Sequence, residues 1–223
     1  MCNAFWGGDT EVNFHGKHCQ VEGGRLNTPF LAPDRTAPEI YVSGHSEASK
    51  RLAYAQGTCL LRVVDTLEKL ESIVALARAR GLRVCLRLGL ICKSTRAAAV
   101  EAAEALLPED RDENTMRLKD DSQMYRESAA TARAQHWLSP HLWTGLVPHY
   151  GPVGTTLLGS PDDVADAFLA YKRIGVSEFI ISGWPEFDEV VTFGRKVLPI
   201  VREAERRLGI VSSDYSWQVA STS

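Results

Sequence analysis

The stretch SGHSEAS, residues 43–49, combines a glycine, a histidine and two serines where an apolar strand is expected to end and a helix to begin. Gly44 permits a sharp turn of the backbone, and His45, Ser46 and Ser49 open the helix. The free N–H groups of a first helical turn and two hydroxyl groups make a plausible binding site for phosphate. The alternative is a serine N-cap with an incidental histidine, and the local sequence leaves both interpretations open.

A second candidate is Arg87, which stands inside the apolar run RVCLRLGLIC, residues 83–92. A buried guanidinium needs an anionic partner, because an unpaired charge in an apolar environment is costly. Arg87 is therefore either a clamp for an anionic substrate or cofactor, or one half of an ion pair in the core.

Aromatic residues occupy two further turns. In EFIISGWPEFDEV, residues 178–190, Trp184 and Pro185 stand between an apolar strand and a helix. Residues 141–154, HLWTGLVPHYGPVG, form a loop rich in Gly, Pro and aromatic residues, suited to covering a site or to making a rigid surface turn. In parallel α/β folds, ligands bind where such turns follow the carboxyl ends of strands.

Metal and disulfide chemistry find little support. His15 and His18 flank Gly16 in a polar segment, but no third ligand accompanies them, so we expect no metal site. The five cysteines are odd in number, scattered and without CxxC spacing, which argues against a disulfide framework and a zinc site.

The elements that must position these residues alternate along the chain from residue 39 onward. Apolar runs typical of strands are separated by segments with helical periodicity. This alternation predicts a parallel sheet with crossover helices, whose strands are apolar because both faces are covered. The expected strands are residues 39–44, 58–64, 83–92, 155–159 and 178–183, and the expected helices lie in 45–57, 65–81, 94–107, 160–175 and 186–208.

Three segments depart from this alternation. Residues 1–38, rich in Gly and Pro, predict a hairpin and an extended lead-in, followed by the α/β unit over residues 39–208. Residues 108–140 form a polar, charged insertion, of the kind that becomes a lid or stays disordered. Residues 209–223 have no core-forming pattern and predict a frayed tail.

Composition limits the classes of function. The 223 residues are 44% hydrophobic and 24% charged, which suits one globular domain with a substantial core. A net charge of -3 argues against nucleic acid and anionic membranes as partners. The chain shows no signal peptide and no apolar stretch near the roughly 20 residues that span a bilayer, so we expect a soluble, cytoplasmic protein.

Several stretches resemble, in their order and spacing, the alkanesulfonate monooxygenases. These belong to the bacterial-luciferase-like enzymes that use reduced FMN and O₂. The resemblance spans about residues 5–208 and matches the carboxyl-terminal half to two-thirds of such an enzyme. It rests on VNFHGKHCQVEGGRL, APEIYVSGHSEASKRLA, RVCLRLGLI, LSPHLWTGLV and GTTLLGSPDDVADAFLAYKRIGVSEFIISGWP.

The resemblance implies an α/β fold that is a partial TIM-like (β/α) barrel lacking the first strands, with its site at the carboxyl ends of the strands. It implies that Ser46 and Ser49, in the same turn as Gly44 and His45, hold the FMN phosphate. It further implies that Arg87 holds an anionic group and that Trp184 shapes the pocket wall.

The resemblance also implies partners: a small-molecule substrate and a separate reductase that supplies reduced FMN. A partial barrel leaves an exposed sheet edge, so we expect a homo-oligomer or a partner chain that completes the barrel.

The departures from the family pattern cluster at the same site. The family's RLH becomes Arg87, Leu88 and Gly89, and its SGYPH becomes SGWPE, with Trp184 in place of a tyrosine. Its TWGE becomes residues 62–65, RVVD, and the arginine of its LVRGG loop is replaced by residues 148–150, PHY.

Three hypotheses remain open. The chain is a luciferase-like monooxygenase with altered site residues, acting on a small substrate that is sulfonated in the family it resembles. Alternatively it is a non-catalytic flavin-binding or partner-binding half-barrel, or a decayed product without a stable function.

Overall fold

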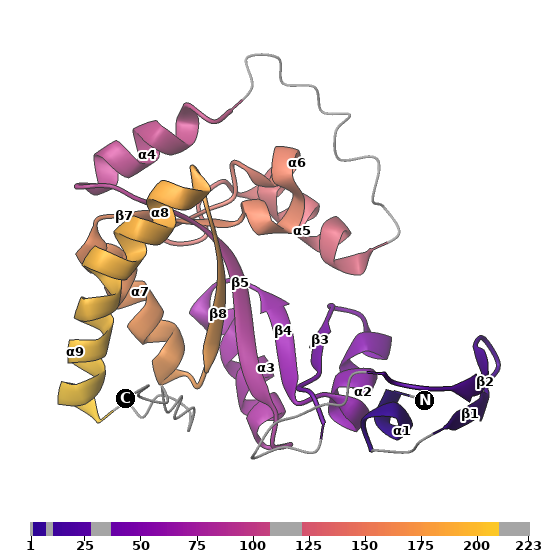
Figure 1. Ribbon diagram of the computed structural model, residues 1–223. Helices are drawn as coiled ribbons and strands as arrows, with labels where there is room; N and C mark the ends of the chain where they lie inside the picture. Colours follow the sequence, from indigo (N-terminus) through magenta and orange to yellow (C-terminus); the bar gives the residue numbers. More distant parts are fainter. Residues whose placement is uncertain (1, 8–10, 28–36, 108–121, 210–223) are drawn as a thin grey trace. The chain divides into compact units, whose positions relative to one another are not determined.

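The computed structural model describes residues 2–7, 11–27, 37–107 and 122–209 (Figure 1). Its internal contacts divide the chain into two compact units, Met1–Ile40 and Tyr41–Ser223. In the first unit, helix α1 (Cys2–Trp6) precedes an antiparallel pair of strands, β1 (Val12–His15) and β2 (Gln20–Gly24). The sequence predicted this hairpin, whereas the short helix α1 was not expected.

The second unit is built on parallel strands. Strands β3 (Tyr41–Ser43), β4 (Cys59–Val63), β5 (Arg83–Cys92) and β8 (Glu178–Gly183) lie side by side in the order β3-β4-β5-β8. Helices α2 (Glu47–Gln56) and α3 (Leu67–Arg78) connect the first three of these strands. This is the parallel sheet with crossover helices that the alternating sequence pattern predicted.

Strand β5 is ten residues long and pairs with two different strands, one after the other, along the same edge. Its first half pairs with β4, and the Arg87 carbonyl accepts the last hydrogen bond from Val64 N–H. Beyond that point Gly89 N–H donates to Thr155, and β7 (Thr156–Gly159) takes over the pairing. The two-residue strand β6 (Leu142–Trp143) then pairs antiparallel with β7.

The two faces of the parallel sheet differ in how well they are covered. Successive strand residues point to opposite faces, and one face is apolar and buried, with Leu60, Leu86 and Leu90 at 1% exposure or less. The opposite face carries Ile180, which is 41% exposed, and Arg87, which is also exposed. This second face is the one that forms the interior of a closed barrel, and here the sheet stays open.

Contacts between the outermost strands show how strongly the sheet is curved. Glu178, at the start of β8, forms an ion pair with Arg83 of β5 at 2.7 Å. Its carboxylate also accepts a hydrogen bond from the hydroxyl of Tyr41, at the start of β3. Since β4 and β5 lie between β3 and β8, the face that carries Arg87 is concave, as expected of a partial barrel.

The predicted insertion contains regular structure. Residues 108–121 lie outside the described residues, whereas Gln123–Ala134 form helix α5. The loop at residues 141–154 contains β6, helix α6 (Val147–Tyr150) and a 3₁₀ turn, Gly151–Gly154. The predicted frayed tail falls on residues outside the described range, apart from Gly209.

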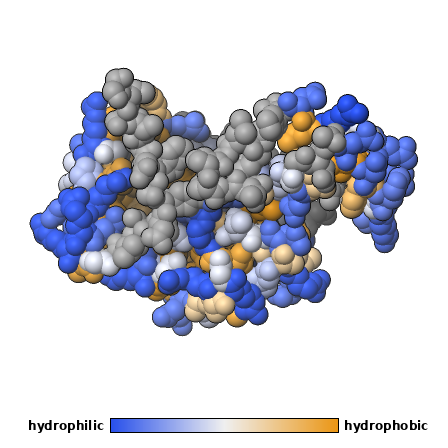
Figure 2. Space-filling model, turned by 60° about the horizontal axis from the view of Figure 1, so that its bottom comes forward, coloured by the Kyte–Doolittle hydropathy of each residue, from blue (hydrophilic) through white to orange (hydrophobic). Residues whose placement is uncertain are grey.

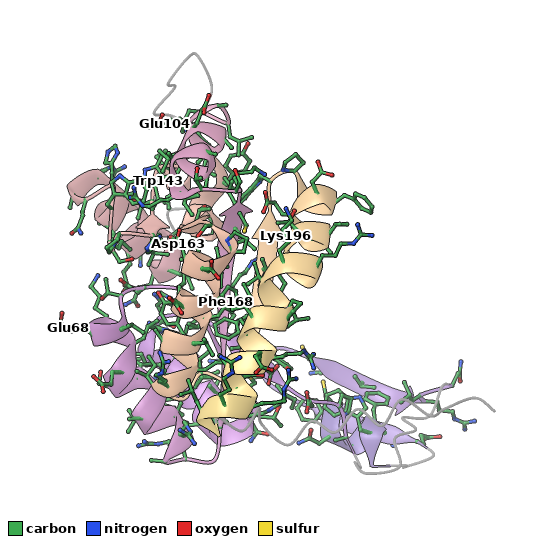
Figure 3. All side chains as sticks on the ribbon, turned by 90° about the vertical axis from the view of Figure 1, so that its left-hand side faces the viewer. Glu68, Glu104, Trp143, Asp163, Phe168 and Lys196 are labelled. Carbon is green, nitrogen blue, oxygen red and sulfur yellow. The ribbon has the colours of Figure 1, made fainter. Side chains whose placement is uncertain are left out.

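At the start of helices α4 (Arg96–Glu104) and α7 (Pro161–Arg173), an N-cap side chain accepts a hydrogen bond from a backbone N–H of the first turn. Thr95 Oγ accepts from Ala98 N–H, and Ser160 and Asp163 form a reciprocal capping box that encloses Pro161. On α7, Phe168 packs against Phe179 of β8, with ring centroids 4.5 Å apart (Figure 3). This aromatic contact joins α7 to the last strand.

The helix expected over residues 186–208 is helical throughout but not uniform. Helix α8 (Glu186–Thr192) passes through a π-helical turn, Phe193–Val197, into α9 (Leu198–Leu208). Pro199 lacks an N–H and its ring conflicts with a carbonyl one turn earlier, which accounts for a local change of helical pitch there.

On the face shown in Figure 2, hydrophilic residues cover most of the described surface, with hydrophobic residues between them. None of the helices in the described part of the chain is long and apolar enough to cross a bilayer.

A buried carboxylate fixes helix α8 to the end of β5. Glu189 is 1% exposed, and its carboxylate accepts a hydrogen bond from Cys92 N–H at 2.8 Å. The same carboxylate pairs with the ammonium group of Lys93. Removing one partner of such a pair leaves a partly buried charge and a backbone N–H without an acceptor.

We therefore expect Glu189→Ala to lower the free energy of unfolding by about 3 kcal/mol, measured by urea denaturation. Asp188→Ala, on the exposed side of the same helix, is the matched control and should cost less than about 1 kcal/mol. Equal losses in the two variants would show that the Glu189 contacts do not hold the helix.

Candidate functional site

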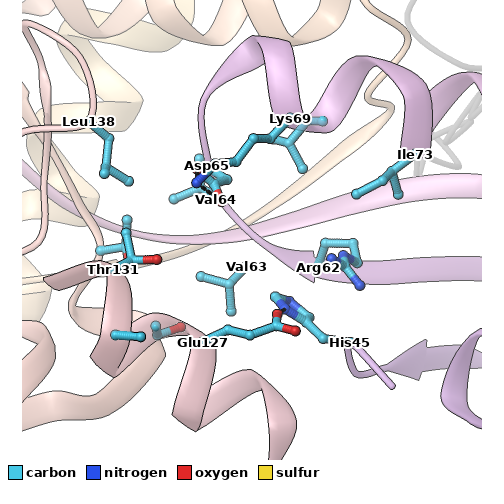
Figure 4. Close-up of a pocket in the computed structure, with 14 residues that line it drawn as sticks. His45, Arg62, Val63, Val64, Asp65, Lys69, Ile73, Glu127, Thr131 and Leu138 are labelled. Carbon is cyan, nitrogen blue, oxygen red and sulfur yellow. Dashed lines mark hydrogen bonds and ion pairs between the residues drawn. The ribbon is translucent and has the colours of Figure 1, made fainter. Parts of the chain in front are cut away.

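A cavity of about 410 Å³ lies at the carboxyl end of β4, between the start of α3 and helix α5 (Figure 4). Polar side chains from four parts of the chain line it. The turn after β3 contributes His45, and β4 with the residues that follow it contributes Arg62 and Asp65. Helix α3 contributes Lys69, and helix α5 contributes Glu127. Apolar residues, among them Val64 and Leu138, complete the wall.

A smaller cavity of about 110 Å³ adjoins it on the concave face of the sheet. Arg87 and Ser43 line this cavity, which shares Arg62 and Val63 with the larger one. The structure therefore brings His45 and Arg87, both predicted as site residues, to neighbouring cavities separated by residues of β4.

The remaining predicted residues of the turn after β3 lie at the start of helix α2. Ser46 is its N-cap, and its Oγ accepts from Ser49 N–H at 3.2 Å, while Ser49 Oγ donates to the Ser46 carbonyl at 2.8 Å. Gly44 has φ +131°, and a Cβ at this position would lie 2.7 Å from Ser49 Oγ. Only glycine therefore lets the turn approach the first helical residues this closely.

His45 is held by a carboxylate that the sequence did not connect to it. Its Nδ1 lies 2.6 Å from Glu127 Oε2, and Glu127 also accepts from the Gln123 amide at 2.7 Å. Burial, together with the nearby Arg62 charge, lowers the pKa of His45 more than Glu127 raises it. Burial favours a higher pKa for Glu127, but its hydrogen bonds from His45 and Gln123 outweigh burial and lower it.

The protonation states follow from these shifts. At neutral pH Glu127 is ionised and His45 is neutral, so His45 Nδ1–H donates to the carboxylate and Nε2 is left as an acceptor. His45 Nε2 is buried and has no hydrogen-bond partner among the described residues.

Arg62 is the second side chain that sequence reasoning missed. It is 8% exposed, and its Nη1 donates to the Gly44 carbonyl at 3.1 Å. Its buried Nε has no hydrogen-bond partner, and no carboxylate forms an ion pair with it in the part of the chain that the structure describes. Burial lowers the pKa of Arg62, because the charged form is poorly solvated.

Trp184 lines neither of the two cavities and packs over Gly89. Its ring centroid is 5.4 Å from that of Tyr150. A Cβ on Gly89 would lie 2.4 Å from Trp184 Cζ3 and 2.5 Å from Thr156 Oγ1. The indole thus fills the space that a side chain at residue 89 would need, so the glycine and the tryptophan that depart from the family pattern form one packing arrangement.

Metal ligation has no candidate here. Across residues 2–7, 11–27, 37–107 and 122–209, no group of three or more His, Cys, Asp or Glu side chains is placed to hold a metal ion.

The fit between Gly89 and Trp184 can be measured by a double-mutant cycle. We expect Gly89→Ala to lower the free energy of unfolding by about 2 kcal/mol, because overpacking a filled core forces neighbours to move. In a Trp184→Ala background the same change should cost less than half as much. Gly194→Ala, whose Cβ would meet nothing within 4 Å, is the control; equal costs in both backgrounds would contradict the fit.

The electrostatic contact between Arg62 and His45 predicts a change in titration. NMR should place the pKa of His45 below its ordinary value of 6.5. Arg62→Met should raise that pKa, because the nearby cation disfavours a second positive charge, while Arg51→Met on the exposed side of α2 should leave it unchanged. A pKa of His45 that does not respond to Arg62→Met would contradict the assignment.

The same shift has a consequence for stability. The pKa of His45 is lower in the folded state than in the unfolded chain. The free energy by which neutral His45 stabilises the fold is therefore fully present above pH 6.5, and it is lost as the pH falls towards the folded-state pKa.

Comparison with solved structures supports the interpretation of the fold. Riboflavin lyase, solved with modified FMN and riboflavin, matches with a TM-score of 0.62 at 19% identity over 92% of this chain and 50% of its own. EDTA monooxygenase from Chelativorans sp. BNC1 gives 0.60 at 20% identity, with 91% and 57% covered. DmoA from Hyphomicrobium sulfonivorans gives 0.61 at 17% identity, with 91% and 53% covered.

These likenesses show a shared fold, and the chain spans about half the length of the structures it matches. The open sheet is therefore a partial barrel of the same kind. The model of one protein family, described as luciferase-like monooxygenase, matches residues 1–178, which is most of the sequence. The chain accordingly belongs to the luciferase-like monooxygenase family.

Proposed function

We propose that this chain provides the carboxyl-terminal half of a monooxygenase that uses reduced FMN and O₂ to oxidise a small anionic substrate, of the alkanesulfonate type. The observation that carries the proposal is the position of Arg87 in a chain of this family. Its side chain stands on the concave face of the partial barrel and lines a cavity with Ser43. A guanidinium in this position is suited to binding a sulfonate or carboxylate.

The start of helix α2 fits the phosphate of FMN. The side chain of Ser46 satisfies the N–H of Ser49, which leaves the first N–H groups of a ten-residue helix without partners inside the helix. Such groups favour an anion, and the hydroxyls of Ser46 and Ser49 stand beside them. The nearby Glu47 carboxylate opposes this, but Lys50 pairs with it at 2.7 Å. Gly44 and His45 complete the proposed cradle.

Each group has a role in this proposal. Reduced FMN, delivered by a separate reductase, would supply the electrons for the reaction with O₂. Arg87 would bind and orient the anionic group of the substrate. Trp184 and Tyr150, which pack together at Gly89 on the same face of β5 as Arg87, would form an apolar boundary that limits the access of water to the site.

The proposal includes a partner that completes the barrel, either a second copy or a separate chain with the first strands. Within the described residues β3 pairs only with β4, and β8 pairs only with β5, so both have an edge without a neighbouring strand. Ile180 on β8 and Phe187 on α8 are 41% and 78% exposed. Pairing and burial on the partner would cover these groups.

A second candidate function is a non-catalytic flavin-binding or partner-binding half-barrel. It is favoured by the packing of Trp184 against Gly89, which replaces two polar groups of the family pattern with an apolar contact. Fewer groups then remain to move a proton or to stabilise developing charge, and each such loss commonly costs on the order of 10²-fold in rate.

Flavin binding can be tested without catalysis. FMN should bind with a dissociation constant in the micromolar range, and Ser46→Asp should weaken FMN at least about tenfold, because aspartate still caps the helix but repels a phosphate. Riboflavin, which lacks the phosphate, should bind both proteins equally. The oligomeric state is measured alongside by light scattering.

Two results would end the cradle assignment. One is the absence of FMN binding at high micromolar concentration. The other is an equal affinity of the wild type and Ser46→Asp for FMN.

Catalysis is tested with a flavin reductase, NADH, FMN and a series of alkanesulfonates, with the purified chain alone and with a co-expressed amino-terminal half-barrel. Release of sulfite that is lost in Arg87→Ala supports the monooxygenase. Flavin binding without sulfite release from any alkanesulfonate, in either preparation, would instead favour the non-catalytic half-barrel.

A further inference from the structure

We propose that Arg62 and the Glu127-bound His45 form a binding site for an oxyanion that still carries a proton, such as hydrogen phosphate or a phosphate monoester in its singly ionised form. Both side chains line the cavity of about 410 Å³ at the carboxyl end of β4 (Figure 4). The proposal does not depend on flavin chemistry, because it concerns the binding of an anion by residues of this chain alone.

The first observation is the incomplete hydrogen bonding of Arg62. The side chain is 8% exposed and makes one hydrogen bond, from Nη1 to the Gly44 carbonyl. Its Nε is buried without a partner in the described structure. A buried guanidinium in this state costs free energy that a bound anion would recover.

The second observation is the orientation of His45. Its Nδ1 donates to Glu127 Oε2 at 2.6 Å, which fixes Nε2 as the nitrogen that accepts. That Nε2 is also buried without a partner among the described residues. The cavity therefore offers a charged donor and a neutral acceptor.

The other charged groups around His45 are already paired. Lys69 of α3 forms an ion pair with Asp65 at 3.2 Å, and Glu127 of α5 is engaged by His45. Arg62 makes no ion pair of its own within the described residues, although the charges of Glu127 and Asp65 act on it across the cavity. A charged oxygen on a ligand would supply the direct acceptor that Arg62 Nε lacks.

A protonated oxyanion satisfies both unmatched groups at once. Its charged oxygen accepts from Arg62, and its hydroxyl donates to His45 Nε2. A fully deprotonated anion such as sulfate can satisfy Arg62 but places an oxygen lone pair against the His45 lone pair. The arrangement thus discriminates between anions of similar size and shape by the proton they carry.

The test compares inorganic phosphate with sulfate by calorimetry on the full chain at pH 7.5. We expect phosphate to bind at least about tenfold more tightly, since a buried acceptor without a donor is costly. Arg62→Met should abolish detectable binding of both anions. Arg51→Met, which removes an exposed arginine of α2, is the matched control and should keep the wild-type affinities.

Lowering the pH gives a second readout. As the pH falls below the pKa of His45, its Nε2 becomes a donor, so the affinity for sulfate should rise and the preference for phosphate should shrink. His45→Gln should reduce the preference at pH 7.5, because its amide can donate to sulfate. This variant keeps the test decisive if Arg62→Met does not fold.

Competition identifies the source of the phosphate. At about pH 6, where a phosphate monoester keeps part of its last proton, displacement of bound phosphate by FMN but not by riboflavin would support the proposal and assign the site to the phosphate end of the flavin. Phosphate that FMN does not displace would support it and assign the site to another ligand. The proposal is overturned if sulfate binds as tightly as phosphate at pH 7.5, or if Arg62→Met leaves both affinities unchanged.

Discussion

Strand β5 is the element on which the positions of the site residues depend. It hydrogen-bonds to β4 and then to β7 along one edge, and to β8 along the other. The concave face that carries Arg87, the packing of Trp184 over Gly89 and the attachment of α8 through Glu189 all follow from these pairings. A strand with three partners cannot shift its register without breaking several rows of hydrogen bonds and exposing its apolar side chains. The geometry of the site is therefore tied to the best-buried part of the molecule.

Local sequence patterns predicted the strands and the starts of helices. The apolar runs gave the parallel strands, and Ser160 with Pro161 and Asp163 gave the start of α7. The contact between His45 and Glu127 could not be foreseen, because 82 residues and an insertion separate them. Glu127 is one of many charged residues in a segment without apolar strands, and only the folded chain shows which of them meets a histidine. The π-helical turn before Pro199 likewise depends on how a long helix accommodates one missing N–H.

Arg62 and Trp184 show how substitutions relative to a family can be interpreted physically. From the sequence, Arg62 appeared only as the first residue of the RVVD that replaces the family's TWGE, whereas in the structure it is a buried cation shared by two cavities. Trp184 and Gly89 appeared as two separate losses, although the indole occupies the space beside the glycine. A tryptophan at 184 and a larger residue at 89 would exclude each other by volume alone. The two changes are therefore best considered together.

The contacts of Glu178 join the first and last strands of the open sheet at one end. Tyr41 and Arg83 both meet this carboxylate where the strands begin, and β4 and β5 span the distance between β3 and β8. The two outer strands are thus bridged by side chains where they begin, while their far ends are connected through the pairings with β4 and β5. A bound ligand or a neighbouring polypeptide at the far ends would therefore have to change the curvature of the sheet, but would not have to break a side-chain bridge between β3 and β8.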